Sequence, residues 1–224
     1  MLVRAIALEK SYRGTGGQPI RVLAGVDLLA KPGEFLAIAG ASGSGKSTLL
    51  NLLGLLEPLD GGEIWFDDLR VSPLARRAQC WVRGTSLGYV FQSFLLISGL
   101  TALENVLLAA RYIGRDRRAA LKDALGLMER LGVAHRSGHY PAQLSGGEQQ
   151  RVAYCRAVLN APPVVLADEP TGSVDDDHAR VILGELRGLS RDRGTSVILV
   201  THRAEAAAEA DRLLRLRDGR LEPS

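Results

Sequence analysis

The sequence has little cysteine, little net charge and no long hydrophobic stretch, and each shortage excludes a class of protein. Only Cys80 and Cys155 occur in 224 residues, too few for a disulfide framework, and their separation does not match a zinc site. No segment approaches the roughly 18 consecutive apolar residues of a membrane-spanning helix. The N-terminus reaches Arg4 at once, so we expect no signal peptide. Any membrane part of the function must come from another chain.

The formal net charge is only +3, and acidic residues and arginines are interleaved along most of the chain. A protein that binds nucleic acid usually concentrates its basic residues on one face, so we expect no nucleic-acid partner. Hydrophobic residues make up 46% of the chain and charged residues 24%, which is enough apolar material for one globular domain with a large core. The composition therefore predicts a globular protein of the cytoplasm with reduced thiols.

Short apolar runs separated by helical stretches are typical of a parallel sheet that is covered on both faces. Four such runs occur, at residues 35–39, 87–91, 164–167 and 197–200. They lead, in order, to a glycine-rich loop, to Gln92, to Asp168 and Glu169, and to Thr201 and His202. Since ligands bind beyond the carboxyl ends of the strands in such sheets, we expect these groups to converge on one site.

The remaining segments divide the expected single domain, residues 1–224, into three lobes. Residues 1–31 alternate weakly around several glycines and predict an antiparallel β lobe. Residues 93–160 predict a helical lobe, with a capping box at Thr101-Ala102-Leu103-Glu104 and helices over 116–131 and 148–159. Residues 32–92 and 161–224 predict an α/β core into which the helical lobe is inserted, with a further helix over 176–191.

The loop after the first apolar run matches the phosphate-binding pattern G-x-x-x-x-G-K-[ST] in full. It reads Gly40-Ala41-Ser42-Gly43-Ser44-Gly45-Lys46-Ser47 and precedes an expected helix. Glycines let successive N–H groups face an anion, and the helix N-terminus adds positive potential. Lys46 can reach the β- and γ-phosphates, and the Ser47 hydroxyl can bind Mg²⁺. The alternative is a glycine-rich turn with a solvated lysine; the complete match favours nucleotide binding.

Asp168 and Glu169 close the third apolar run. An acid at the end of that strand can hold Mg²⁺ through water, and a second carboxylate beside it can orient or deprotonate an attacking water. Either acid alone could equally cap a helix or lie on the surface. In a chain that also has a phosphate-binding loop, the pair favours hydrolysis of a nucleotide.

A second string places a hydroxyl and unhindered N–H groups at the start of a helix. It reads Leu144-Ser145-Gly146-Gly147-Glu148-Gln149-Gln150-Arg151. This arrangement could bind an anion, although by physics alone a simple helix cap is the better explanation. The string resembles the signature of the ABC ATPases without a departure, and the resemblance covers essentially the whole chain. It implies a P-loop NTPase (RecA-like) core with a mostly parallel sheet, an N-terminal antiparallel β subdomain and an inserted helical subdomain.

The resemblance implies roles for the residues that match the motifs of the family. Tyr12 stands where the family has an aromatic residue that stacks on adenine, Gln92 at the Q-loop and His202 at the H-loop. The implied catalytic residues are Lys46, Gln92, Glu169 and His202, with Glu169 polarising the hydrolytic water. Further contacts to ATP would come from Gly40, Ser42, Gly43, Ser44, Gly45, Ser47 and Thr48, while Ser47, Gln92 and Asp168 would lie at Mg²⁺. The D-loop would be Ser173-Val174-Asp175.

The signature also implies how two copies work together. Ser145, Gly146 and Gly147 would contact the γ-phosphate of ATP bound to another copy. The working unit would then be a head-to-tail homodimer that forms on ATP binding, with two ATP molecules at its interface.

Several phrases resemble the LolD/MacB group of ABC ATPases and FtsE. They are the glycine-rich insertion after Tyr12 and residues 49–54, 101–106 and 166–172. Such proteins serve an integral-membrane permease, which implies a peripheral position on the inner face of the cell membrane. Residues 93–100 would receive the permease's cytoplasmic helix or would pack within the helical lobe. The alternative function is an FtsE-like regulator of cell-wall hydrolysis that transports nothing.

Overall fold

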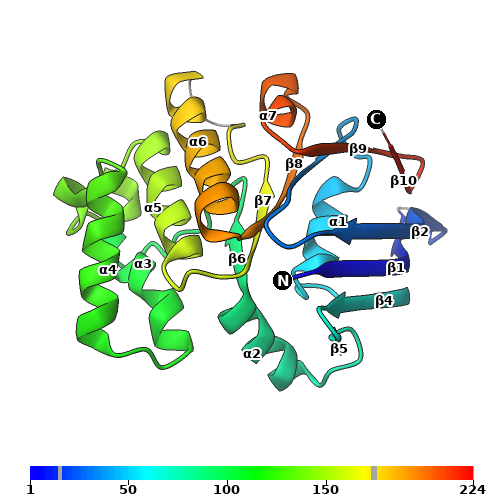
Figure 1. Ribbon diagram of the computed structural model, residues 1–224, viewed down its shortest axis with the longest axis horizontal. Coiled ribbons are helices and arrows are strands. Elements are labelled where there is room, and N and C mark those ends of the chain that lie inside the picture. Colours follow the sequence, from blue (N-terminus) through cyan, green and yellow to red (C-terminus); the bar gives the residue numbers. More distant parts are fainter. Residues whose placement is uncertain (15–16, 173–175, 224) are drawn as a thin grey trace.

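The computed structural model describes residues 1–14, 17–172 and 176–223. Three helices, α3 (Ala102–Tyr112), α4 (Arg117–Arg130) and α5 (Gly146–Val158), lie on one side of the molecule, and an antiparallel sheet lies on the other (Figure 1). Ser173, Val174 and Asp175, which match the D-loop, lie outside the described residues, as does Gly16. Within the described ranges, no helix has both the length and the hydropathy that crossing a membrane requires.

The central sheet, as far as the chain is described, has six strands. They are β3 (Phe35–Ala39), β6 (Leu87–Val90), β7 (Val164–Asp168), β8 (Ser196–Thr201), β9 (Arg212–Arg217) and β10 (Arg220–Pro223). The order is β10-β9-β3-β8-β7-β6, and all neighbours except β10 and β9 are parallel. The four apolar runs are therefore confirmed as parallel strands. Every residue of β7 and β8 is buried, which explains why their sequences do not alternate.

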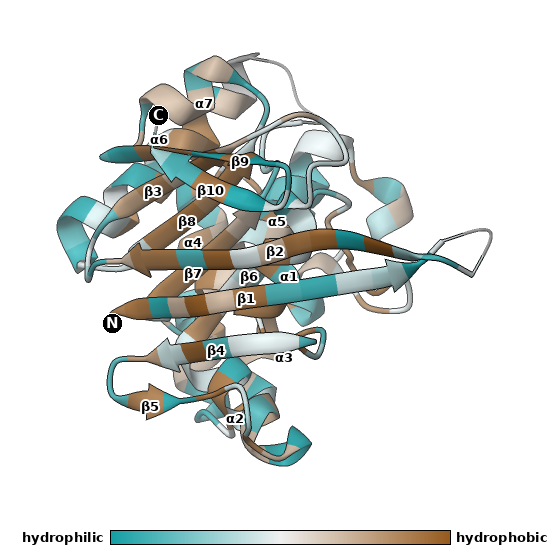
Figure 2. Cartoon of the chain, turned by 90° about the vertical axis from the view of Figure 1, so that its right-hand side faces the viewer, coloured by the Kyte–Doolittle hydropathy of each residue, from teal (hydrophilic) through white to brown (hydrophobic). Residues whose placement is uncertain are grey.

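The second sheet is antiparallel and larger than the segment 1–31 predicts (Figure 2). It contains β1 (Val3–Arg13), β2 (Pro19–Ala30), β4 (Gly61–Phe66) and β5 (Leu69–Arg70), in the order β2-β1-β4-β5. The sequence division assigns 61–70 to the core, whereas the pairing of β4 with β1 places this hairpin in the antiparallel sheet. Ile64 and Phe66 of β4 are buried in the apolar cluster beneath that sheet, and this burial is what brings β4 to β1.

The predicted helices are present, and their ends differ from the predicted ones by at most two residues. Besides α3 to α5, the helices are α1 (Lys46–Leu53), α2 (Arg76–Ser86), α6 (Asp176–Arg193) and α7 (Ala204–Ala208), with 3₁₀ turns η1 (Ala134–Arg136) and η2 (Pro141–Gln143). In the capping box of α3, the Thr101 hydroxyl accepts from the Glu104 N–H at 3.3 Å, and the Glu104 carboxylate accepts from the Thr101 N–H at 2.9 Å. Gly132 and Gly194 follow α4 and α6 with φ of 65° and 64°, a conformation that glycine adopts without strain.

Helix α1 lies between the two sheets and carries the phosphate-binding loop at its N-terminus. Its Leu49, Leu50, Leu52 and Leu53 are fully buried together with side chains of both sheets. Full burial of a leucine side chain stabilises the folded state by roughly 1.5–3 kcal/mol relative to leaving it exposed. The loop is therefore held at the carboxyl edge of the parallel sheet by the best-buried helix of this region.

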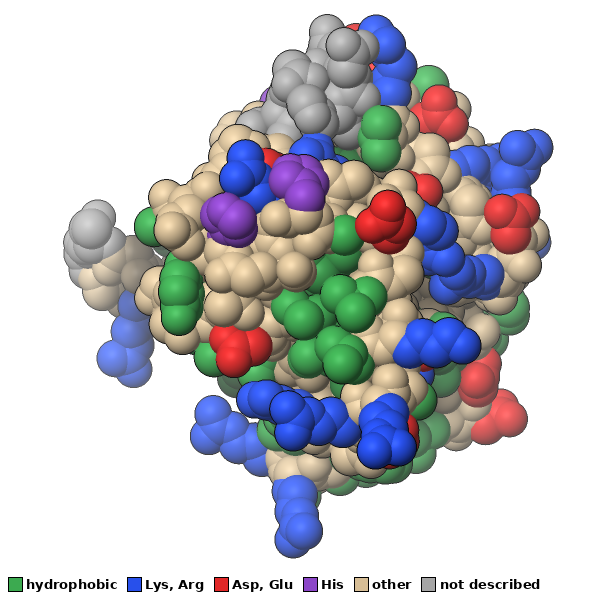
Figure 3. Space-filling model, turned by 90° about the vertical axis from the view of Figure 1, so that its left-hand side faces the viewer, with side chains coloured by type: hydrophobic (Ala, Val, Ile, Leu, Met, Phe, Trp, Pro, Cys, Tyr) green, Lys and Arg blue, Asp and Glu red, His purple; other side chains and the backbone are tan. Residues whose placement is uncertain are grey.

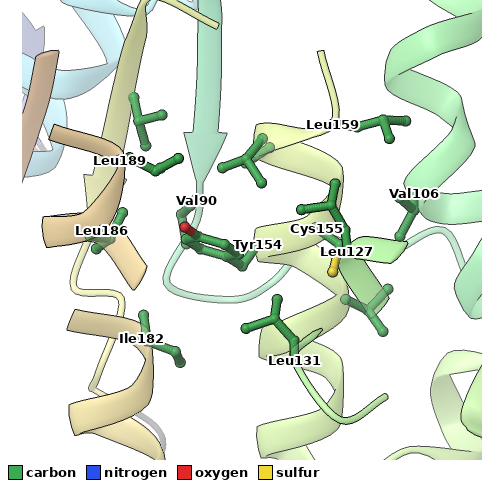
Figure 4. Packing of buried hydrophobic residues seen from close by; sticks show 14 of the residues in the cluster. Val90, Val106, Leu127, Leu131, Tyr154, Cys155, Leu159, Ile182, Leu186 and Leu189 are labelled. Carbon is green, nitrogen blue, oxygen red and sulfur yellow. The ribbon is translucent and has the colours of Figure 1, made fainter. Parts of the chain in front are cut away.

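Helix α5 joins the helical lobe to the core through a second apolar cluster (Figure 4). Tyr154 of α5 faces Leu186 and Leu189 of α6, while Cys155 faces the side of Leu127 on α4. Interiors packed in this way transmit displacement rather than absorb it. A shift of α5 must therefore move the helices that flank it.

The outer face of the helical lobe carries a small apolar patch between basic side chains (Figure 3). On α4, Leu121 and Leu125 are exposed one turn apart, close in sequence to Arg117, Arg118 and Lys122. Apolar and acidic side chains interrupt the basic ones on this face, so it presents no continuous positive stripe.

Candidate nucleotide-binding site

The phosphate-binding loop has the shape of an anion nest. Gly45 has a φ of 98°, and a Cβ at this position would lie 2.7 Å from Cγ1 of Val22, so conformation and space both require glycine. The Lys46 ammonium donates to the carbonyl oxygens of Gly40 and Ala41, both at 2.9 Å, and the side chain is only 7% exposed. Lys46 thus spans its own loop, with its charge held where phosphate oxygens can replace the two carbonyls.

Ser47 and Asp168, 121 positions apart in sequence, meet at this loop. The Ser47 hydroxyl donates to Asp168 Oδ1 at 3.0 Å. Burial raises the pKa of the Asp168 carboxyl; the Ser47 hydrogen bond lowers it, the neighbouring Glu169 carboxylate raises it and Lys46 lowers it. A hydroxyl and a carboxylate supply the oxygen ligands that Mg²⁺ prefers. A divalent cation would offset the free-energy cost of burying the negative charge of Asp168. The donor set fits the predicted metal.

No group of three or more His, Cys, Asp or Glu side chains suited to a metal occurs in the part of the chain that is described. Mg²⁺ commonly takes only one or two protein ligands and completes its shell with water and substrate phosphates. The sparse donor set at Ser47 and Asp168 is therefore the kind that needs a bound nucleotide to complete it.

Glu169 lies beside this pair in an unusual backbone conformation. Its φ is 43°, and its N–H donates to the Val200 carbonyl on β8 at 3.0 Å. A left-handed conformation at a residue other than glycine is strained, and such strain clusters at functional sites. One carboxylate oxygen, Oε1, lies 2.8 Å from Nδ1 of His202, whereas Oε2 is buried and has no hydrogen-bond partner among the described residues. The buried, unpaired oxygen requires a donor, and a water molecule is the simplest one.

Gln92 follows β6 and is exposed. Its amide nitrogen lies 3.8 Å from the position that a Cβ would take on Gly172, three residues after Glu169. The fold thus brings Gln92 to the loop that follows the two acids, as the convergence of strand ends predicts.

Tyr12 lies at the end of β1, close to α1. Its hydroxyl donates to Glu57 Oε2 at 2.6 Å, and the residue is 39% exposed. The Lys10 ammonium is 5.4 Å from the centroid of the ring. Burial and the hydrogen bond to Glu57 raise the pKa of Tyr12, whereas a hydrogen bond to Thr48 lowers it. The ring therefore lies beside the phosphate-binding helix with its hydroxyl anchored.

The signature string forms the N-terminus of α5. The Ser145 hydroxyl accepts from the Glu148 N–H at 3.2 Å, and the Glu148 carboxylate accepts from the Ser145 N–H at 2.7 Å. Arg136 donates to the same carboxylate at 2.8 Å. These hydrogen bonds lower the pKa of Glu148 to about 2, the largest effect coming from the Ser145 backbone. Ser145 and Gly146 are exposed, and across the described ranges no hydrogen bond or ion pair joins this turn to the phosphate-binding loop.

Two groups near the site escape sequence analysis. Glu57 is the partner of Tyr12, and Arg156 of α5 donates to the carbonyls of Phe94 and Leu95, at 2.7 and 2.6 Å. Phe94 and Leu95 have φ of 61° and 47°. Left-handed conformations of such residues leave no trace in sequence patterns, so only the fold reveals this contact.

The sequence family described as ABC transporter matches residues 23–172. The chain belongs to this family. It is 45% identical, over 99% of its length and 92% of the relative, to the lipoprotein-releasing system ATP-binding protein LolD 2 of Chlorobaculum tepidum. It is 44% identical, over 98% of its length but 34% of the relative, to the macrolide export ATP-binding/permease protein MacB of Rhodospirillum rubrum. This ABC ATPase thus spans nearly the whole of a LolD protein and about a third of a MacB protein.

Solved ABC cassettes have the same fold. The dimeric structure of the bacterial ABC transporter cassette MJ0796 superposes with a TM-score of 0.93 at 38% identity, covering 98% of this chain and 96% of that chain. The same cassette in a post-hydrolysis state, bound to ADP and Pi, gives 0.89 at 38% identity, covering 99% and 98%. The predicted ABC ATPase fold of the LolD/MacB type is confirmed.

Proposed function

We propose that this ABC ATPase binds ATP with Mg²⁺ as one domain of 224 residues and hydrolyses it to drive a separate membrane permease of the lipoprotein-release or macrolide-export type. The observation that carries the proposal is the buried Glu169 carboxylate, with one oxygen on His202 and the other without a hydrogen-bond partner in the described part of the chain. It lies next to the Ser47–Asp168 pair at the mouth of the phosphate-binding loop.

ATP would enter with its phosphates in the loop 40–47. The Lys46 ammonium would exchange its two carbonyl acceptors for phosphate oxygens, and the N–H groups from Gly43 to Thr48 would donate to the same anion. Ser47 and Asp168 would hold Mg²⁺ with Gln92 beside them, and the metal would neutralise charge on the phosphates.

Hydrolysis would use the unpaired oxygen of Glu169. That oxygen would accept a proton from a water molecule while the water oxygen bonds to the γ-phosphorus. The bond from this phosphorus to the β,γ-bridging oxygen would break, and ADP would leave with the electron pair. His202 holds the other oxygen at 2.8 Å and keeps 61% of its side chain exposed. Its free ring nitrogen would contact the γ-phosphate, so binding of ATP would fix the base and the substrate together.

The signature turn would complete the site of a second copy. Ser145 uses its oxygen to accept the Glu148 N–H, which leaves the hydroxyl proton free to donate to a phosphate. Gly146 and Gly147 would add N–H groups at the positive end of α5. The dimeric cassette to which this chain is similar supports such a pairing.

The permease would contact the segment after Gln92. Leu95 and Ile97 are 54% and 49% exposed, whereas Leu96 between them packs on the core cluster. The two uses predicted for this segment are therefore compatible, because its side chains alternate between the lobe and the surface. We place the protein at the inner face of the cell membrane, held there through this contact. The relatives favour this transport function over a regulator of cell-wall hydrolysis.

Replacing the base tests the proposal. Glu169→Gln keeps the size and the His202 contact but cannot accept the proton, so turnover falls while ATP still binds and the dimer accumulates. Glu222→Gln, an exposed acid on β10, is the matched control and retains turnover. Steady-state ATPase assays and size-exclusion chromatography with ATP measure both effects. Full turnover in Glu169→Gln would show that the base is another group.

A further inference from the structure

The Glu57 carboxylate, in the loop after α1, connects two side chains that sequence analysis leaves separate. Its Oε2 accepts from the Tyr12 hydroxyl at 2.6 Å, and its Oε1 accepts from the Asn51 amide at 2.8 Å. Both oxygens are therefore engaged by neutral donors. Hydrogen bonds to an ionised acceptor are stronger than those between neutral groups, so this carboxylate holds each partner in one orientation.

Asn51 is itself fixed from the other side. Its amide oxygen accepts from the Tyr89 hydroxyl at 3.0 Å. The Tyr89 ring stacks on Phe91, with centroids 4.0 Å apart and planes at 16°. A Cβ on Gly54 would lie 2.9 Å from the same ring, so the ring occupies space that only glycine leaves. Burial raises the pKa of Tyr89, which keeps its hydroxyl a donor. The Asn51 amide cannot turn without breaking one of its two bonds.

The Tyr12 ring has one face covered. The Lys10 ammonium lies 5.4 Å from its centroid and is held by the Pro58 carbonyl at 2.8 Å and by Asp60 at 3.5 Å. With the hydroxyl tied to Glu57 and one face beneath Lys10, a planar ligand can stack only on the opposite face. A positive charge behind the ring and a fixed hydroxyl leave the aromatic face, rather than a hydrogen-bonding edge, as the recognition surface.

We infer that Glu57 is a positioning residue for nucleotide binding: it orients Tyr12 for stacking on the base, and Asn51 and Tyr89 hold Glu57 in place. The inference rests on the proposed binding of ATP and on the stacking of adenine on Tyr12 that the resemblance to the family implies. Its physical basis is preorganisation, because a ring fixed before binding loses less rotational freedom when the base arrives. The chain of bonds runs from β1 through α1 to β6, so the base site is anchored on the helix that carries the phosphate loop.

The test separates base contacts from phosphate contacts. Tyr12→Phe keeps the ring but removes its anchor, and Glu57→Ala removes the other partner. Each variant raises the KM for ATP by up to about 10-fold, the cost of ordering one freed side chain on binding, with kcat nearly unchanged. Inorganic tripolyphosphate has no base, so its inhibition constant stays at the wild-type value. The double variant is no worse than Tyr12→Phe alone, because Glu57→Ala removes an interaction that Tyr12→Phe has already removed.

Glu63→Ala is the control, since Glu63 is an acid on β4 bound to Trp65 and Arg70 rather than to Tyr12. Thermal melting without nucleotide confirms that each variant is folded. If Glu57→Ala weakens the binding of tripolyphosphate as much as the binding of ATP, the variant damages the phosphate-binding loop and the inference is wrong. If Tyr12→Ala raises the KM but Tyr12→Phe and Glu57→Ala do not, the base contact stands and the inference alone fails. An unchanged KM in Tyr12→Ala refutes the base contact itself.

Discussion

Arg156 offers a quantitative test of how the signature helix α5 is coupled to the segment that follows Gln92. Its guanidinium donates to the carbonyls of Phe94 and Leu95 at 2.7 and 2.6 Å, and burial lowers its pKa. Two hydrogen bonds from a charged group are worth about 3–6 kcal/mol in total. They hold two residues other than glycine at positive φ, which costs about 2–4 kcal/mol in total.

Arg156→Ala loses the bonds but releases the strain, because the segment can then relax. We expect a net loss of about 1–2 kcal/mol of unfolding free energy, a fall in Tm of roughly 2–8 °C for a domain of this size. Urea or thermal unfolding measures this loss. Arg156→Lys loses less than Arg156→Ala, because one ammonium is a point charge and cannot span both carbonyls as the planar guanidinium does.

The functional consequence is larger than the loss of stability. With the segment relaxed, α5 and the proposed permease contact would move independently, so we expect hydrolysis by the isolated subunit to persist while its stimulation by the permease disappears. ATPase assays with and without the permease in proteoliposomes measure the two rates. Arg111→Ala, an exposed arginine on α3, is the control. Wild-type stability together with full stimulation in Arg156→Ala would refute the reasoning.

Three further predictions follow from single residues. Asp168→Asn stabilises the nucleotide-free protein at pH 7 while abolishing turnover. The pKa of Asp168 is raised in the folded state, so ionising its carboxyl costs folding free energy at any pH above the folded-state pKa and costs none below the unfolded-state pKa. Equal Tm values for the variant and the wild type at pH 7 would contradict this prediction. Cys80 reacts with maleimide in the native protein, because hydrogen bonds to Tyr112 and Arg83 lower the pKa of its thiol, whereas burial raises the pKa of Cys155 to about 12 and protects that thiol until the protein unfolds. Mass spectrometry counts the labels, and two labels on the native protein would contradict the packing of α5. Gly45→Ala abolishes ATP binding in a filter or fluorescence assay, since its Cβ would meet Val22 at 2.7 Å at a φ of 98°; retained affinity would contradict the loop geometry.

Elements whose physical cause is local could be predicted from the sequence. Continuous apolar runs identify β3, β6, β7 and β8 because strands buried on both faces cannot alternate. Thr101 marks the start of α3 because its capping box lies within four residues, whereas α5 begins at Gly146, two residues before the predicted start, with a capping box at Ser145. The carboxyl ends of these four strands converge at one edge of the sheet because the strands are parallel. The division into lobes at residue 31 is less accurate, since β4 pairs with β1 and β5 with β4, although β2, β3 and α1 separate β1 from β4 in the sequence.

The amino-acid sequence by itself predicted the chemistry of the phosphate-binding loop and of the acid pair, because glycine, lysine and carboxylate act there through spacing of a few residues, whereas the role of the signature turn came from the resemblance to the family. Only the tertiary structure decided which groups orient them. Glu57 meets Tyr12 across 45 positions and Arg156 meets Phe94 across 62. The left-handed backbones of Phe94, Leu95 and Glu169 are likewise imposed by packing and distant hydrogen bonds, which no local propensity encodes.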